Sequence, residues 1–193
     1  MSTTQYLFAG FGGQGILSVA TILGAAALAD NLYLKQAEVH GMSQRGGDVM
    51  SCLRLSSSPI ASDLIGLGKA DLIVSLEPME AARYQQYLAP EGRVITSTVA
   101  FVNIPNYPDT EAVVARLKEL KGTVAFDMDE VAKEVATVRS SNMVLLGAAA
   151  PYIDIEPAKI EAAIETVFGA KGEKLVSQNI AAFRAGYELS AKH

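Results

Sequence analysis

A cluster of glycines near the N-terminus is the feature best suited to binding chemistry. Gly10, Gly12 and Gly15 fit the G-x-G-x-x-G spacing, and Gly13 and Gln14 lie between them. Glycine lets a backbone turn sharply and come close to a ligand, and free N–H groups at the start of a helix favour negative charge. The glycines follow the apolar segment 6–9 and precede an alanine-rich segment without proline. They predict a strand–turn–helix unit. The turn either binds an anionic ligand, alone or together with a partner chain, or is only a tight structural turn.

An NAD site has a second requirement, which this sequence does not meet at the expected place. The dinucleotide pattern needs an acidic residue about 20 positions after the glycines, at the end of the second strand, to bind the ribose hydroxyls. Residues 34–37 are Leu, Lys, Gln and Ala, and Glu38 follows only within a polar segment predicted to be a loop. An independent NAD(P)-dependent enzyme therefore stays an alternative that Lys35 disfavours.

A second polar segment, residues 36–48, is predicted to be a loop after a strand over 32–35. It gathers polar side chains and a pair of adjacent glycines: Glu38, His40, Ser43, Gln44, Arg45, Gly46 and Gly47. Open α/β sheets bind ligands at the carboxyl ends of their strands, and the planar guanidinium of Arg45 suits a carboxylate or a phosphate. The segment is either a ligand or interface loop, or a surface loop whose arginine pairs with Glu38 or Asp48. A lone histidine without a partner motif favours a hydrogen-bonding role for His40.

Asn142 is the third candidate, because it opens a predicted helix of small residues. One interpretation is a helix N-terminus that faces a cleft. The other, which the residue types favour, is a polar cluster in which Ser140 or Ser141 caps the helix. These segments supply no combination of nucleophile, base and orienting group, so the sequence predicts no catalytic residue and no metal ligand in this chain. Cys52, the only cysteine, is expected to be a buried packing thiol in a strand.

Alternating strands and helices must position these segments. The pattern predicts strands over 6–9, 32–35, 49–56, 71–76, 93–97 and 123–126. It predicts helices over 16–29, 78–87, 109–122, 128–138, 142–150, 157–168 and 173–190. The alternation implies an α/β fold with a Rossmann-like, doubly wound and mainly parallel sheet, followed by a helical C-terminal third. No repeat or break in composition divides the chain, so one domain over 1–193 is expected.

Composition narrows the classes of partner. With 50 % hydrophobic and 19 % charged residues and a net charge of −5, the chain lacks the basic surface that nucleic acid requires. Residues 1–5 carry no basic region before a long apolar stretch, so no signal peptide is expected, and no apolar stretch is long enough to span a bilayer. One cysteine excludes an intrachain disulfide and every cysteine-ligated iron–sulfur cluster within this chain. We therefore expect a cytoplasmic protein that binds neither nucleic acid nor membrane.

Four segments together resemble one family, the gamma subunits or domains of 2-oxoacid:ferredoxin oxidoreductases. They are residues 8–15, residues 38–47, residues 70–74, and Asn142–Met143 with Leu146–Ala148. They occur in the right order, and the resemblance runs from about residue 5 to residue 187. The loop with His40, Met42 and Gln44 before Arg45 most resembles the small (beta) subunit of the indolepyruvate enzymes. Pyruvate, 2-oxoglutarate and branched-chain relatives share the Glu and Arg-Gly-Gly frame of this loop more than its histidine.

The resemblance implies a subunit of a larger enzyme that oxidatively decarboxylates a 2-oxoacid, here indolepyruvate or another arylpyruvate, to an acyl-CoA. It places thiamine diphosphate, Mg²⁺ and 4Fe–4S clusters on a large partner subunit, which passes electrons to ferredoxin. This chain would cover the active site, help to bind coenzyme A and be inactive alone. The glycine turn and the loop Glu38–Gly47 match motif positions of the family, and the resemblance assigns neither of them a chemical step. A stand-alone module that senses a nucleotide or coenzyme A is the alternative from another class.

Overall fold

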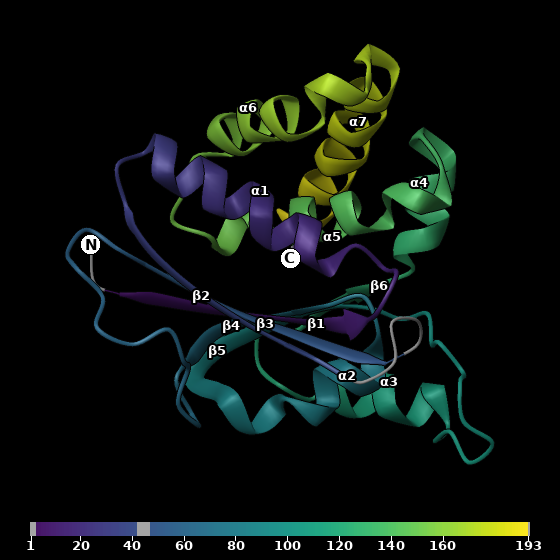
Figure 1. Cartoon of the computed structure of the whole chain (residues 1–193). Coiled ribbons are helices and arrows are strands. Elements are labelled where there is room, and N and C mark those ends of the chain that lie inside the picture. The colour runs from purple at the N-terminus through teal and green to yellow at the C-terminus, as the bar shows by residue number, and fades with distance from the viewer. Residues whose placement is uncertain (1–2, 42–46, 193) are drawn as a thin grey trace.

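The computed structural model describes residues 3–41 and 47–192, and in this part of the chain a six-stranded sheet forms the middle layer (Figure 1). The strands have the order β2-β3-β1-β4-β5-β6. Their bounds are β1 Thr4–Phe11, β2 Tyr33–His40, β3 Asp48–Ser56, β4 Ala70–Ser75, β5 Leu88–Ser97 and β6 Val124–Phe126. Strands β1, β4, β5 and β6 are joined by parallel pairings, whereas β3 is antiparallel to both β1 and β2. The sheet is mainly parallel, as predicted, and β1, β2, β4 and β5 end at one edge.

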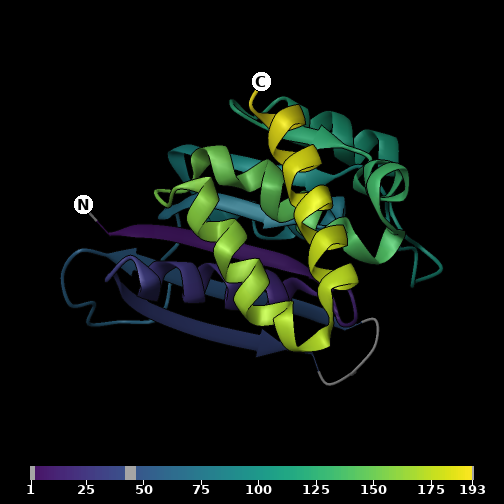
Figure 2. The same cartoon turned by 90° about the horizontal axis from the view of Figure 1, so that it is seen from above.

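Helices cover both faces of this sheet (Figures 1 and 2). One face carries α1 Ile16–Ala29, α4 Met128–Val135, α5 Ser141–Ala149, α6 Pro157–Phe168 and α7 Glu173–Ser190. The other carries α2 Pro78–Arg83 and α3 Thr110–Lys118. Short 3₁₀ helices lie at Gln85–Tyr87, Val138–Ser140, Ala150–Tyr152 and Gly169–Lys171. The fold is therefore doubly wound with a helical C-terminal third, as the sequence predicts. No helix in the described ranges is both long and apolar enough to cross a bilayer.

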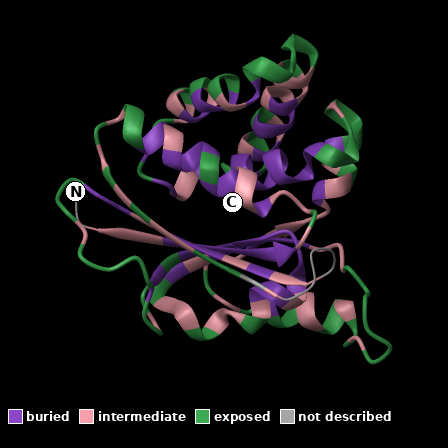
Figure 3. Cartoon of the chain, viewed as in Figure 1, coloured by how far each residue is buried: buried purple, intermediate pink, exposed green. Residues whose placement is uncertain are grey.

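Each face of the sheet has its own apolar core (Figure 3). Successive side chains of a strand point to opposite faces, so Phe8 packs beneath the larger helical layer while Leu7 packs against the smaller one. Both are fully buried, which explains why the sequence of β1 is continuously apolar instead of alternating. Cys52 is buried in the smaller core, and burial raises the pKa of its thiol, so the predicted packing role is confirmed.

Two glycines set how closely α5 and α7 pack. A Cβ atom on Gly147 would lie 1.9 Å from the carbonyl oxygen of Phe183, and one on Gly186 would lie 2.0 Å from that of Val144. The helix backbones therefore touch directly at this crossing, and no larger residue fits. All nine residues of α5 are buried. This position in the middle of the larger layer explains the small-residue composition of α5.

Strand β2 is the main departure from the predicted elements. It continues to His40 instead of ending at Lys35, so Glu38 and His40 belong to a strand and not to a loop. Antiparallel pairing with β3, from Tyr33 opposite Ser56 to His40 opposite Val49, supplies the backbone hydrogen bonds for the extra residues. The polar composition reflects a half-exposed edge strand, which local sequence does not distinguish from a loop.

Other element ends shift for similar reasons. Strand β5 begins at Leu88, not Arg93, because Leu88 already pairs with Ala70 of β4. The register of this pairing then shifts, and the predicted turn at residues 90–92 lies at the shift. The predicted helix 78–87 ends at Arg83 and is followed by a 3₁₀ turn. The predicted helix 109–122 ends at Lys118, although Asp109 caps its start as expected, by accepting hydrogen bonds from two backbone N–H groups.

Candidate functional site

The turn between β1 and α1 is built by two left-handed glycines and a folded-back glutamine. Gly13 and Gly15 have φ angles of 101° and 76°, a region that residues with a Cβ rarely adopt. The Oε1 atom of Gln14 accepts a hydrogen bond of 2.7 Å from the backbone N–H of Phe11. A Cβ atom on Gly10 would lie 2.7 Å from that same oxygen, so Gly10 leaves the space in which Gln14 closes the turn.

The β2–β3 hairpin lies beside this turn. The N–H of Gly12 donates to the carbonyl of Gly47 at 2.9 Å, and the N–H of Gly41 donates to that of Asp48 at the same distance. Glu38 lies further back on β2, where it accepts a hydrogen bond of 2.6 Å from Gln36 Nε2. Ser43, Gln44, Arg45 and Gly46 lie outside the described residues, as does the side chain of His40.

Asn142 joins the first turn of α5 to the glycine turn. Its Nδ2 donates to the carbonyl of Gly15 at 3.2 Å, and the residue is only 8 % exposed. The predicted serine cap is wrong: Ser140 occupies the N-cap position of α5 but makes no capping hydrogen bond from its side chain. The Ser141 hydroxyl instead contacts Asp129 Oδ1 at 2.5 Å, because α4 packs against this end of α5.

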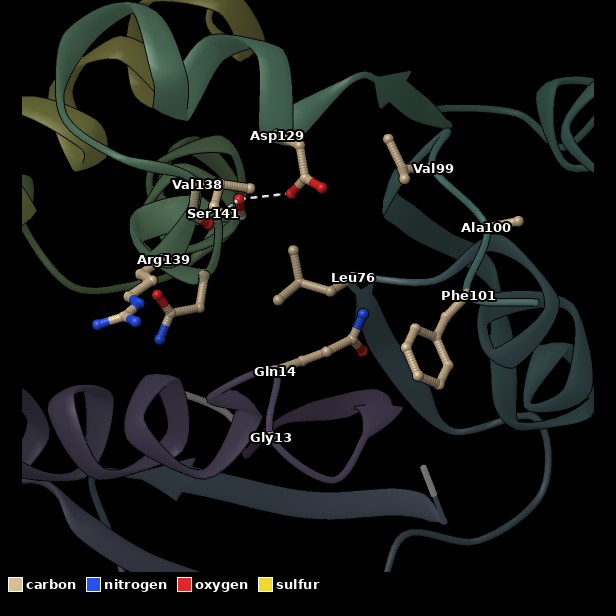
Figure 4. Close-up of a pocket in the computed structure, with 11 residues that line it drawn as sticks. Gly13, Gln14, Leu76, Val99, Ala100, Phe101, Asp129, Val138, Arg139 and Ser141 are labelled. Carbon is tan, nitrogen blue, oxygen red and sulfur yellow. Dashed lines mark hydrogen bonds between the residues drawn. The ribbon is translucent and has the colours of Figure 1, made fainter. Parts of the chain in front are cut away.

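The glycine turn and the start of α5 line a pocket of about 490 Å³ at the carboxyl edge of the sheet, which we name the edge pocket (Figure 4). Gly13 and Gln14 form one wall, and Asn142 contributes from α5. The remaining lining residues are Leu76, Val99, Ala100, Phe101, Asp129, Val138, Arg139 and Ser141. A smaller cavity of about 320 Å³ opens on the other side of the turn, against Gly12, Gly13 and Gly15. Gly10 lines neither cavity, so its role in the described structure is to accommodate Gln14.

The family model described as pyruvate ferredoxin/flavodoxin oxidoreductase matches residues 5–189 of the chain. The chain belongs to this family. Indolepyruvate oxidoreductase subunit IorB of Methanothermobacter thermautotrophicus is 34 % identical over 190 residues, which are 95 % of this chain and 95 % of that protein. The pyruvate/ketoisovalerate oxidoreductases common subunit gamma of Pyrococcus furiosus is 31 % identical over 94 % of both chains. The resemblance inferred from four short segments is therefore confirmed over nearly the whole chain.

A solved structure of the family has the same fold. The 2-oxoglutarate:ferredoxin oxidoreductase of Magnetococcus marinus, solved with 2-oxoglutarate, coenzyme A and succinyl-CoA bound, superposes with a TM-score of 0.78 at 23 % identity. The match covers 100 % of this chain and 32 % of that longer chain. The oxidoreductase fold thus occurs both as a separate subunit and as about one third of a longer polypeptide.

Sequence reasoning missed part of the edge pocket of this oxidoreductase-family chain. Asp129 and Arg139 were not singled out, nor was the segment 99–101. A signal was present: Leu76 directly follows β4, Val99 closely follows β5, and Asp129 closely follows β6. The carboxyl ends of parallel strands meet at one edge, so these residues could have been grouped once the strands were assigned. Arg139 has no such signal, because its helical segment reaches the edge only through tertiary packing.

A buried carboxylate pair beneath the sheet also went unpredicted in this family member. Glu77 and Glu80 are fully buried around the start of α2. Glu77 accepts hydrogen bonds from the backbone N–H of Glu80 and from the Tyr107 hydroxyl, and both oxygens of Glu80 lie 3.1 Å from Arg83 Nε. Burial raises the pKa of Glu80 against the opposing effect of Arg83, and burial beside the Glu77 carboxylate raises that of Tyr107. These contacts cap α2 and anchor the segment 98–108, which are structural roles.

The described residues contain no group of three or more His, Cys, Asp or Glu side chains that could hold a metal ion.

The order of the strands disfavours the NAD alternative. Strand β2, which would present the ribose-binding carboxylate beside β1, is separated from β1 by the antiparallel strand β3.

Proposed function

We propose that this chain is the small subunit of an indolepyruvate-type 2-oxoacid:ferredoxin oxidoreductase, forms one gamma-type domain over 1–193, and contributes one wall of a coenzyme A site. The observation that carries the proposal is the edge pocket, because two of the family's motif segments, the glycine turn and the start of α5, meet there. Relatives that match over nearly their whole length support the assignment to a subunit of this class.

Coenzyme A suits the edge pocket in size and chemistry. A volume of about 490 Å³ lies within the range of ligand pockets. Apolar walls combined with backbone N–H groups suit a ligand that has an uncharged arm and anionic groups. The related Magnetococcus marinus enzyme was solved with coenzyme A bound. We propose that the residues of the turn either contact the cofactor or shape its pocket; they are Gly10, Gly12, Gly13, Gln14 and Gly15.

The β2–β3 hairpin is the proposed ligand or interface loop. Gly47, just before β3, contacts the glycine turn by accepting a hydrogen bond from the N–H of Gly12. The role of Arg45 as an anion-binding guanidinium stays a prediction, as do those of His40, Ser43, Gln44 and Gly46. Asn142 belongs to the same proposed site, because it lines the pocket and binds the turn.

The redox chemistry belongs to a partner. A 4Fe–4S cluster takes cysteine thiolates as ligands, and this chain has one cysteine, buried in the smaller core. We therefore place the clusters, thiamine diphosphate and Mg²⁺ on a large subunit, from which electrons pass to ferredoxin. When bound there, thiamine diphosphate supplies the carbanion chemistry of decarboxylation. A cytoplasmic location follows as part of the proposal, since a ferredoxin-coupled enzyme with a free thiol fits a reducing compartment.

The substrate class can be tested on the assembled enzyme. The chain is co-expressed with its proposed large partner subunit, and CoA-dependent reduction of a viologen dye is measured with indolepyruvate, phenylpyruvate, pyruvate, 2-oxoisovalerate and 2-oxoglutarate. We expect kcat/KM for an arylpyruvate to exceed that for the small 2-oxoacids by about tenfold or more, since an aromatic ring fills more apolar pocket surface. Preference for pyruvate, 2-oxoisovalerate or 2-oxoglutarate would instead place the chain with the gamma subunits of those enzymes, the alternative that the Pyrococcus furiosus relative favours.

A further inference from the structure

A second cavity adjoins the edge pocket at Arg139. It has a volume of about 290 Å³ and lies among α1, α7 and the 3₁₀ helix Val138–Ser140; we name it the helix pocket. Ser18, Leu175 and Gln178 are among its lining residues. Arg139 and Asn142 line both cavities, so the two spaces meet at these side chains. A ligand longer than the edge pocket therefore has a second space to enter at this junction.

The main part of the edge pocket is suited to uncharged polar groups. Asp129 lines it with a carboxylate, one oxygen of which accepts a hydrogen bond from Ser141 (Figure 4). The Oε1 atom of Gln14 is occupied by the N–H of Phe11, which leaves its amide nitrogen as the donor for a ligand. Between them lies the apolar side chain of Leu76. A carboxylate acceptor and an amide donor above an apolar surface match hydroxyl and amide groups, whereas the Asp129 charge repels a phosphate.

The junction at Arg139 has the opposite character. Arg139 is exposed, and its guanidinium makes no ion pair with any described residue. Figure 4 places this guanidinium across the pocket from Val99 and Phe101. Asn142, next to it in the pocket wall, binds the carbonyl of Gly15 and so brings the starts of α1 and α5 together. Neither start is capped by a side-chain hydrogen bond, and the N-terminal end of a helix favours negative charge, as the guanidinium does. This combination suits a phosphate group.

From this separation of charge we infer the orientation of coenzyme A in the site, which rests on the proposed function. The phosphates bind at Arg139, where the two pockets meet, and the amide-bearing pantetheine arm crosses the edge pocket past Asp129 and Leu76 toward Phe101. Asp129 and Arg139 thereby recognise different parts of one ligand. Arg139 is a phosphate-binding residue of this chain, and Asp129 binds the hydroxyl or amide groups of the arm.

Competition experiments on the assembled enzyme separate the two ends. Inhibition constants against CoA are measured for pantetheine, which lacks phosphate, and for ADP, which lacks the arm. Arg139→Gln should raise the inhibition constant of ADP and the KM for CoA about tenfold or more. The inhibition constant of pantetheine should stay within about twofold. Asp129→Asn keeps an oxygen that can accept the hydrogen bond from Ser141. It should raise the inhibition constant of pantetheine and the KM for CoA, and leave the inhibition constant of ADP within about twofold. Arg116→Gln, an exposed arginine on α3, is the matched control and should change none of them.

The outcomes distinguish the two claims. The orientation is overturned if Arg139→Gln affects pantetheine and Asp129→Asn affects ADP, or if both variants bind all three compounds like wild type. If CoA, pantetheine and ADP fail to compete at all in the wild-type complex, the proposed coenzyme A site itself is wrong. Thermal unfolding of each variant checks that the chain still folds.

Discussion

Gly15 shows how much of the site depends on single residues. It adopts a φ of 76°, ends the glycine turn and occupies the N-cap position of α1, and its carbonyl accepts the hydrogen bond from Asn142. The glycine spacing predicts a turn here, but it does not predict Asn142, which is 127 residues away along the chain. Local sequence encodes the turn because the required backbone angles favour glycine. The partner of the turn is fixed only by packing between distant helices.

We predict that Gly15→Ala destabilises the chain more than Gly13→Ala. Both positions have positive φ angles, and an alanine in that region costs on the order of 1 kcal/mol. At Gly15 a Cβ atom would also lie 2.5 Å from Asn142 Nδ2, whereas at Gly13 nothing lies within 4 Å. The total loss at Gly15 should therefore reach roughly 2–3 kcal/mol in the free energy of unfolding, measured in urea. Gly169→Ala, with an ordinary φ of −54° and no atom within 4 Å, is the control and should be neutral or slightly stabilising. Equal losses at the two turn positions would show that Asn142 does not constrain Gly15.

Glu80 gives a prediction about pH. Burial raises its pKa in the folded chain above the ordinary value of 4.5, so the folded state keeps this proton to higher pH than the unfolded state does. The free energy of unfolding should therefore lose a contribution as pH rises from about 4.5 through the raised value. Glu80→Gln mimics the protonated form and should show a shallower fall over this window in urea titrations at a series of pH values. Glu188→Gln, on the exposed side of α7, should follow the wild-type curve. Parallel curves for wild type and Glu80→Gln would contradict the assigned burial effect.

At the scale of elements, periodicity and turn residues were sufficient for most helices and strands. Helices α1, α6 and α7 begin and end where the sequence predicts. Strand β2 was shortened in the prediction, because its second half is polar and its pairing with β3 is invisible to a local pattern. The edge pocket illustrates the same limit. Its walls come from the ends of β1, β4 and β5 and from the starts of α4 and α5, and only the parallel sheet brings these segments together.

The α5–α7 crossing should be the contact between helices least tolerant of added volume. Gly147→Ala and Gly186→Ala each place a Cβ atom about 2 Å from a backbone oxygen, and a backbone cannot move aside as a flexible side chain does. We expect each to cost on the order of 3 kcal/mol in the free energy of unfolding, or to prevent folding. Gly24→Ala in α1 is the matched control, because its Cβ would lie 3.4 Å from Leu34 and alanine favours a helix interior. Circular dichroism during urea unfolding measures all three variants. Wild-type stability of both crossing variants would mean that the helices are not packed at backbone contact.

For the whole molecule, the central claim is that this chain is an incomplete enzyme. Its fold supplies a pocket at the carboxyl edge of a sheet, and its family assigns it to a 2-oxoacid oxidoreductase. Its single cysteine cannot ligate a 4Fe–4S cluster. Composition and motif segments predicted this division of labour from sequence. They did not predict the proposed division of the pocket into a phosphate end and an amide end, because only the folded chain places Asp129 and Arg139 in the walls of one pocket.

The most direct test compares this chain alone, the large subunit alone and the two assembled, in one assay of indolepyruvate- and CoA-dependent viologen reduction. The account predicts that the purified chain is colourless, contains no iron and gives no activity, because it cannot ligate a cluster. It predicts that the large subunit alone has no CoA-dependent turnover and that adding this chain restores both the rate and saturation by CoA. Activity from this chain alone would contradict the account. So would a large subunit whose kcat and KM for CoA are unchanged when this chain is added.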